Sequence, residues 1–384
     1  MWKGRPTWAE IDLDALAHNV GEIRKAVGQD TGVMAVVKAN AYGHGAVPIS
    51  RAVIAAGASR LGVACVDEGI ELRQAGIKAP ILVMGYVPIW EAGALVQYGL
   101  VPTITSRELG KALSELASRS KFILPVHVKV DTGLSRFGLS PADTIAMVAY
   151  LRNLPGVTIE GLWTHFASAD EADKSFTLRQ FAAFSALANL CPDIPCRHVG
   201  ASAVALDLPA MGLNLVRAGI SLYGLYPSSE VSHAIYLKPV LSLKSRIGRL
   251  TSLSIGDAVS YGRTWVATGP TRVALVPCGY ADGLRRSLSN KGAVLIAGHR
   301  APILGRVCMD QFVADVTGIP NVKVDDEVVL IGRQGAEEIS VEEMASWSDT
   351  INYEIVCGIS ARVPRIYLRN GQIDEAVTLV KKTG

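Results

Sequence analysis

The sequence lacks the long apolar segments and the charge excess that are typical of membrane proteins and nucleic-acid-binding proteins. No stretch of its 384 residues approaches the ~20 apolar residues of a membrane-spanning helix, and no signal-peptide core precedes residue 9. Lys and Arg total 38 and Asp and Glu total 35, so the net charge is only +3. These absences predict a cytoplasmic protein with neither a membrane nor a nucleic acid as its partner.

The six cysteines lack the paired spacing with histidines that marks a metal site. Cys191 and Cys196 are the only close pair, and Pro192 and Pro195 between them indicate a loop with ordinary buried thiols. In a reducing compartment, cysteines are free thiols by default. We therefore expect no metal and no disulfide.

The sequence also has no internal repeat, no low-complexity tract and no GxGxxG motif after an early strand. The missing glycine motif disfavours an open, doubly wound sheet. Short apolar runs alternate instead with helical patterns about eight times, which predicts an α/β fold built on a (β/α)8 TIM-type barrel. The expected strands are 33–37, 61–64, 81–84, 101–104, 126–130, 161–164, 197–199 and 215–216.

The pattern changes between residues 227 and 239. Beyond this point, β-branched runs are separated by Gly-Asp and Gly-Pro turns, with one helical stretch near 341–347. We therefore predict two domains, a barrel over residues 1–235 and a mostly β domain over residues 236–384. The expected strands of the second domain include 273–276, 293–296, 311–316 and 327–331.

Lys38 occupies the position with the clearest chemical meaning. It closes the apolar run 32–37, and Gly43 and Gly45 follow it. Burial among apolar neighbours favours the neutral amine, which is the form that bonds an aldehyde cofactor as a Schiff base. The alternative is a lysine that extends its charged end from a strand into water.

Six short segments around and beyond Lys38 carry a family resemblance. They are VVKANAYGHG at 36–45, VDTG at 130–133, VRAGISLYG at 216–224, VSYG at 259–262, RVCMD at 306–310 and INYE at 351–354. In this order and spacing they resemble the bacterial alanine racemases, enzymes of fold type III that depend on pyridoxal 5'-phosphate. The resemblance implies a cofactor-binding barrel followed by a β domain.

The resemblance also implies the cofactor contacts. They are Lys38, Tyr42, Arg136, His165, Ser202, Arg217, Gly219, Ile220 and Tyr353. Arg217 would face the pyridine nitrogen, where most pyridoxal-phosphate enzymes place a carboxylate. Because a guanidinium only donates hydrogen bonds, it would keep that nitrogen unprotonated and favour reversible proton exchange at Cα over transamination.

Racemisation needs a base on each face of Cα, and the resemblance implies Lys38 and Tyr261. In the family, Tyr261 and Met309 enter the partner subunit's barrel, so we expect a homodimer with shared active sites. Arg136 and the backbone of Met309 would bind the substrate carboxylate. The resemblance also implies a crowded entry, which favours the small side chain of alanine, and it implies D-alanine for peptidoglycan as the product.

Three alternatives remain open at this point. An amino-acid racemase of broad specificity would use the same chemistry. A fold-type-III decarboxylase would present a carboxylate, not Arg217, to the pyridine nitrogen. A cofactor-carrying barrel without activity would lack the second domain and Tyr261.

The state of Lys129 is also open. Lys129 is either carbamylated, as in several relatives, or an unmodified lysine in an ion pair.

Overall fold

The structure is a computed structural model that describes residues 2–380. Its contacts divide the chain into two compact units. The barrel unit comprises residues 15–41 and 46–238, and the β unit comprises residues 2–14, 42–45 and 239–380. The N-terminal strand thus belongs to the β unit. The predicted domain boundary after residue 235 stays a prediction.

Eight parallel strands form the barrel unit, in the order β8-β7-β6-β5-β4-β3-β2-β9. They are β2 (Gly32–Val36), β3 (Arg60–Val63), β4 (Ile81–Val83), β5 (Val101–Ile104), β6 (Leu124–Lys129), β7 (Val157–Trp163), β8 (Cys196–His198) and β9 (Leu215–Ala218). Two backbone hydrogen bonds connect the ends of this sheet, from Asn214 to Arg197 (3.2 Å) and from Arg217 to Gly200 (2.9 Å). The barrel is therefore nearly closed.

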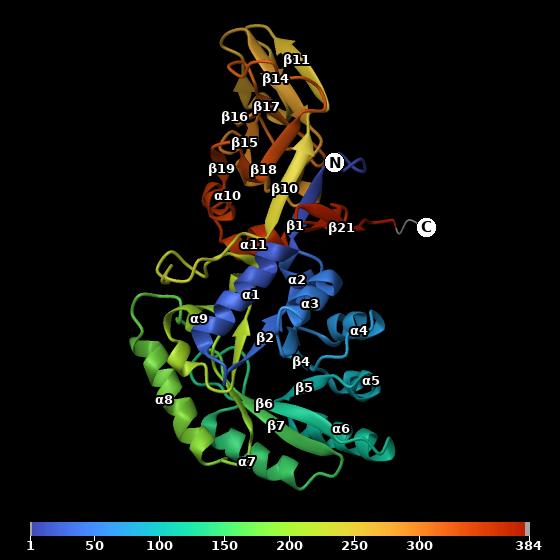
Figure 1. Ribbon diagram of the computed structural model, residues 1–384, viewed down its shortest axis with the longest axis vertical. Helices are drawn as coiled ribbons and strands as arrows, with labels where there is room; N and C mark the ends of the chain where they lie inside the picture. Colours follow the sequence, from blue (N-terminus) through green and yellow to red (C-terminus); the bar gives the residue numbers. More distant parts are fainter. Residues whose placement is uncertain (1, 381–384) are drawn as a thin grey trace. The chain divides into compact units, whose positions relative to one another are not determined.

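Helices lie on the outer side of these strands (Figure 1). They are α1 (Leu13–Val27), α3 (Ala46–Ala55), α4 (Val66–Gln74), α5 (Ala92–Tyr98), α6 (Arg107–Arg119), α7 (Pro141–Arg152), α8 (Ser175–Asn189) and α9 (Ser202–Asp207). The side chains of Ser106 and Ser140 cap α6 and α7 by accepting a backbone N–H from the first turn of each helix. Within residues 2–380, no helix combines the length and apolar character needed to cross a membrane.

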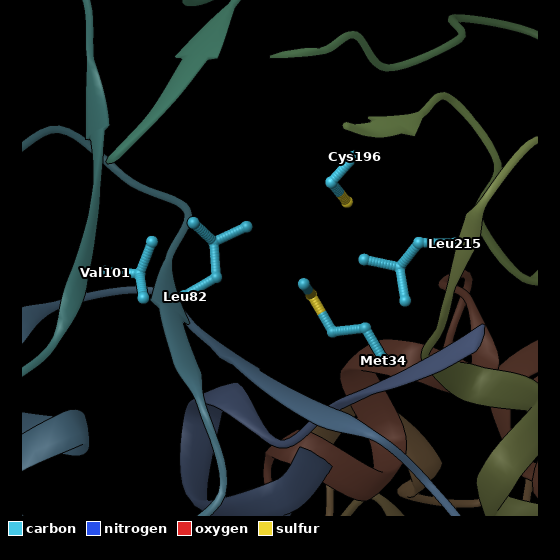
Figure 2. Packing of buried hydrophobic residues seen from close by; sticks show 5 residues of the cluster. All are labelled: Met34, Leu82, Val101, Cys196 and Leu215. Atoms are coloured by element: carbon cyan, nitrogen blue, oxygen red, sulfur yellow. The ribbon is translucent and has the colours of Figure 1, made fainter. Parts of the chain in front are cut away.

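The barrel interior begins with an apolar layer contributed by five strands. Figure 2 shows the buried side chains of this layer pointing toward one another: Met34, Leu82, Val101, Cys196 and Leu215. Because strand side chains alternate with a period of two, the residues two positions after Cys196 and Leu215 also face inward. These residues are His198 and Arg217, so a polar layer lies next to the apolar one.

The β unit is built on an eleven-stranded sheet in the order β11-β14-β17-β16-β15-β18-β10-β1-β20-β21, with β19 beside β18. The strands are β1 (Trp8–Asp12), β10 (Leu241–Arg246), β11 (Arg249–Leu253), β14 (Thr271–Val276), β15 (Ala293–Ile296), β16 (His299–Leu304), β17 (Phe312–Asp315), β18 (Glu327–Gln334), β19 (Glu337–Ile339), β20 (Arg365–Arg369) and β21 (Gln372–Val377). A separate ribbon pairs β12 (Ala258–Val259) with β13 (Trp265–Val266), and two helices, α10 (Val341–Trp347) and α11 (Asn352–Cys357), complete the unit. The predicted fold class, a TIM-type barrel with a mostly β second part, is confirmed.

Candidate active site

Lys38 lies just beyond the C-terminal end of β2, half-buried at the start of an unusual turn. The next residues, Ala39, Asn40 and Ala41, adopt left-handed helical angles with φ of 52–53° and ψ of 48–52°. Such angles cost a non-glycine residue roughly 1–2 kcal/mol each. The sequence predicted a glycine-flanked turn here but not this conformation, for which only Asn40 gave a signal, since asparagine tolerates left-handed angles.

Side-chain hydrogen bonds hold this turn in place. Glu68 on α4 accepts the N–H of Ala39 (2.6 Å) with one oxygen and the N–H of Ala64 (2.7 Å) with the other. Asn40 Oδ1 accepts the N–H of Ala46 at the start of α3 (2.8 Å). Strained backbone that surrounding groups hold in this way is concentrated at functional sites. Lys38 is thus carried by a fixed segment, not a flexible loop.

Ser202 collects several hydrogen-bond donors at the start of α9. Its buried Oγ accepts the N–H groups of Gly219 (3.0 Å) and Ser221 (3.3 Å) and the hydroxyl of Ser221 (2.9 Å). Donors that converge on one oxygen would also suit an oxygen of a phosphate group. The geometry around Ser202 and Gly219 therefore fits an anionic group, and the sequence reasoning missed Ser221 as a donor.

Arg217 lies on β9, and only 2% of it is exposed. Nη1 donates to Nδ1 of His198 (2.8 Å) and to the carbonyl of His198 (3.0 Å). Nη2 donates to the carbonyls of Thr164 (2.8 Å) and Val199 (2.9 Å) and to Nδ1 of His165 (3.1 Å). Among the guanidinium nitrogens, Nε alone makes no hydrogen bond to residues 2–380.

The charge of Arg217 has no carboxylate partner within the part of the chain that the structure describes. Carbonyl oxygens and imidazole nitrogens solvate it instead. Burial lowers the pKa of Arg217 to about 9, which leaves the group charged at neutral pH. A fixed, charged donor with one N–H to spare fits a ring nitrogen that acts as an acceptor, as the pyridine of pyridoxal phosphate does when unprotonated.

Several cations gather around His165, which follows β7. Burial lowers the pKa of His165 well below its usual value, and the charges of four cations add to this effect: Arg217, Lys129, Arg136 and Lys38. Lys38, Arg136, His165 and Ser202 follow the C-terminal ends of β2, β6, β7 and β8, the rim at which barrel enzymes carry their active sites. The structure therefore brings the predicted barrel residues to one rim, and Arg136 is exposed there.

Lys129 lies inside this group of cations at the end of β6. Burial and the charges of Arg217 and Arg136 lower the pKa of Lys129 to about 8. Its Nζ lies 4.4 Å from the ring centroid of Trp163 and 4.9 Å from that of Phe137. About a tenth of Lys129 is therefore neutral at pH 7, and the neutral amine is the form that reacts with carbon dioxide. Carbamylation of Lys129 stays a prediction.

The remaining predicted residues belong to the β unit. The rings of Tyr42 and Tyr353 lie 6.2 Å apart, and burial raises the pKa of Tyr42. Tyr261 is 73% exposed and Met309 is 53% exposed. Their loops are joined, because Ser260 Oγ donates to the carbonyl of Arg306 (2.6 Å).

Ser260, immediately before Tyr261, has φ 65° and ψ −175°, a region that is essentially restricted to glycine. Sequence reasoning gave no sign of it.

The fold and the rim geometry define a class. It is an eight-stranded parallel barrel with a strand-end lysine, a serine oxygen on which hydrogen-bond donors converge and a buried arginine, with a mostly β unit on the same chain. Comparisons with known proteins agree. Residues 11–227 match the family model "Alanine racemase, N-terminal domain", and residues 240–367 match "Alanine racemase, C-terminal domain". The chain belongs to the alanine racemase family, and the prediction of an isomerase acting on amino acids is confirmed.

Individual relatives are similar over nearly the whole chain. The alanine racemase of Halothermothrix orenii is 48% identical over 367 residues, covering 94% of this chain and 97% of the relative. That of Desulforamulus reducens is 46% identical over 369 residues, covering 94% and 99%. Among solved structures, alanine racemase of Clostridium difficile 630 superposes with a TM-score of 0.95 at 38% identity, covering 98% of this chain and 99% of that one. The Bacillus anthracis enzyme with bound L-Ala-P gives 0.92 at 38% identity, with the same coverage.

Proposed function

We propose that this protein interconverts L-alanine and D-alanine with pyridoxal 5'-phosphate as its cofactor. Membership in the alanine racemase family supports the proposal. The observation that carries it within this chain is the buried Arg217, whose Nε makes no hydrogen bond to the described residues. A permanent donor at a pyridine nitrogen suits racemisation and argues against decarboxylation and transamination.

The cofactor, when bound, supplies an electron sink that makes the Cα proton of an amino acid acidic. Lys38 would hold it covalently through Nζ. Tyr42, Ser202, Tyr353 and the N–H groups of Gly219 and Ile220 would bind its phosphate. Arg217 would donate to its ring nitrogen, while His165 accepts from Arg217 (3.1 Å) and fixes the guanidinium beside the ring. Arg136 would complete the cofactor contacts from the rim.

The chain's own groups would then exchange protons at Cα, one removing a proton from one face and the other delivering a proton to the opposite face. Nζ of Lys38 would remove or return the proton on one face, and the phenolic oxygen of Tyr261 would do so on the other. Arg136 and the backbone of Met309 would bind the substrate carboxylate. The exposure of Tyr261 and Met309 supports a homodimer in which each β unit supplies these residues to the partner's barrel.

The product would be D-alanine for peptidoglycan, made in the cytoplasm. The six cysteines are all free thiols, which supports a reducing compartment.

Deuterium exchange at Cα tests the proposal. The cofactor-loaded protein should exchange the Cα proton of L- and D-alanine in D₂O and interconvert them, with serine and lysine turned over far more slowly. Tyr261→Phe should lose racemisation, whereas Tyr236→Phe changes another exposed tyrosine, 67% exposed, and should not. Equal rates with alanine, serine and lysine would indicate a racemase of broad specificity and not one specific for alanine. No exchange with any of them would refute the proposed reaction.

A further inference from the structure

A continuous chain of hydrogen bonds crosses the polar layer of the barrel from Arg217. Nη1 of Arg217 lies 2.8 Å from Nδ1 of His198, and Nε2 of His198 lies 2.8 Å from Nδ1 of His127. Nε2 of His127 lies 3.1 Å from a carboxylate oxygen of Glu160. Arg60 then binds that carboxylate with both Nη atoms, at 2.6 and 2.9 Å. We call these five side chains the barrel relay.

The direction of every hydrogen bond in the barrel relay is fixed by its two ends. Arg217 can only donate, so Nδ1 of His198 accepts and its proton must be on Nε2. That proton is donated to Nδ1 of His127, which leaves the proton of His127 on Nε2. The ionised Glu160 can only accept, and this requirement leads independently to the same position for the proton of His127. Both ends therefore select one tautomer of each imidazole.

Both imidazoles are also held neutral. Each is fully buried, and burial lowers the pKa of both. The charge of Arg217 adds to this at His198, whereas at His127 burial outweighs the hydrogen bond to Glu160, which raises the pKa. At the other end, the hydrogen bond from His127, aided by Arg60, lowers the pKa of Glu160 to about 2. Two neutral dipoles thus lie in line, with acceptor nitrogens toward Arg217 and N–H groups toward Glu160. In this orientation they reinforce one another.

The surrounding strands leave room for this arrangement. A Cβ atom on Gly161 would lie 2.4 Å from the ring of His127, so only glycine admits the ring in its present position. The pairing of β6 with β7 shifts register between Val126 and His127, next to the same place. Trp163 stacks on His198 with centroids 5.6 Å apart and planes 6° from parallel. Gly161 and Trp163 therefore restrict both rings.

A metal is the competing explanation for this cluster. His127, Cys196 and His198 offer ligand atoms that all lie within 4.8 Å of one another. However, the two imidazole nitrogens that face each other are 2.8 Å apart, which is the distance of a direct hydrogen bond and leaves no room for a metal ion between them. Their other nitrogens are bonded to Arg217 and Glu160. All four imidazole nitrogens are already used, so the hydrogen-bonded explanation accounts for more of the geometry.

We propose that Glu160 is a positioning residue of the active site: through the fixed tautomers of His127 and His198, it presents an acceptor to Arg217 and holds the guanidinium with Nε left for the cofactor. The cofactor step of this inference rests on the proposed function. If His198 carried its proton on Nδ1 instead, two donors would meet at 2.8 Å, and Arg217 would have to turn away.

The first test measures the tautomers directly. Long-range ¹H–¹⁵N spectra of the ¹⁵N-labelled full-length protein, with and without pyridoxal phosphate, report which nitrogen of each imidazole is protonated. We expect Nε2–H on both His127 and His198 at pH 7. Glu160→Gln keeps only the selection made by Arg217, because the new amide can either accept from or donate to Nε2 of His127, so this variant should yield a mixture of tautomers. Gly161→Ala, which pushes the His127 ring and removes no polar group, should do the same, whereas Asp193→Asn breaks the exposed ion pair with Arg152 and should change nothing.

The second test measures turnover by the loaded enzyme. Glu160→Gln should lower kcat for alanine roughly tenfold, a change of about 1.4 kcal/mol, with KM within about twofold. A mixture of imidazole tautomers in Glu160→Gln without a fall in kcat would overturn the positioning role of Glu160. Histidinium at pH 7, an Nδ1–H tautomer of His198, or Zn²⁺ binding that shifts both rings would overturn the barrel relay itself, even if no variant folds. If the wild-type protein shows the expected tautomers but does not racemise alanine, the proposed function is refuted and the barrel relay is not.

Discussion

Replacing Ser260 should reverse the usual stability order of alanine and glycine. Ser260 has φ 65° and ψ −175°, and a side chain in this region costs roughly 1–3 kcal/mol. Its hydroxyl donates to the carbonyl of Arg306 at 2.6 Å, a bond worth about 1 kcal/mol net. Ser260→Ala and Ser260→Gly both lose this bond, so the difference between them contains only the backbone strain and the greater chain entropy of glycine.

The magnitude follows from two opposing terms. Glycine removes the strain, but it costs about 0.5–1 kcal/mol more than alanine in lost chain entropy. We therefore expect Ser260→Gly to be more stable than Ser260→Ala by about 1 kcal/mol, or about 2–4 °C in Tm for a unit of about 150 residues. Thermal and urea unfolding followed by circular dichroism would measure it.

The matched control is Ser252, an exposed serine on β11 whose φ is not positive. There, Ser252→Ala should be the more stable variant, as in an ordinary strand. If alanine is also the more stable residue at position 260, the strain argument is refuted. Activity provides a second readout, because a relaxed backbone before Tyr261 should lower kcat in Ser260→Gly even though the protein is more stable.

Further predictions concern the cofactor, the dimer and pH. Lys38→Ala should lose the cofactor that borohydride traps, and peptide mapping of the reduced wild type should find the label on Lys38 and on no other lysine. Mixing Lys38→Ala with Tyr261→Phe chains should restore up to about a quarter of wild-type activity, since random exchange makes about half the dimers mixed and each has one intact site; no recovery despite proven exchange would place Tyr261 in its own chain's site. The pKa of Glu160 is lowered from 4.5 to about 2, so its contribution to stability is present above pH 4.5 and is lost as the pH falls toward 2. Urea midpoints between these pH values should therefore fall more steeply for the wild type than for Glu160→Gln, and parallel curves would contradict this.

Much of the barrel could be predicted from the sequence because its strands are short apolar runs separated by helical patterns. All eight expected strands overlap β2 to β9, and the expected helix at 341–347 is α10 (Val341–Trp347). Lys38 stood out for the same reason, since a charged residue that ends a buried strand is rare and costly. The resemblance to a family supplied the remaining site residues.

Other structural features could not be predicted from the local sequence pattern. The left-handed angles after Lys38 depend on Glu68, which is 30 positions away from Lys38 and contributes no signal to the turn itself. His127, Glu160 and His198 lie on the three neighbouring strands β6, β7 and β8, and their hydrogen bonds exist only once these strands have paired. The same holds for β1, which lies within the predicted barrel domain of residues 1–235 but pairs with β10 and β20, both beyond the barrel strands.

That placement of β1 has a consequence for how the chain folds. Trp8–Asp12 pairs antiparallel with β10, beginning at Leu241, and parallel with β20, beginning at Arg365. During synthesis, the first strand of the chain must therefore wait without either neighbour while the whole barrel sequence is made. Contacts this distant in sequence form slowly. We expect the barrel unit to acquire structure first, and the sheet of the β unit to be completed only after β20 and β21 have left the ribosome.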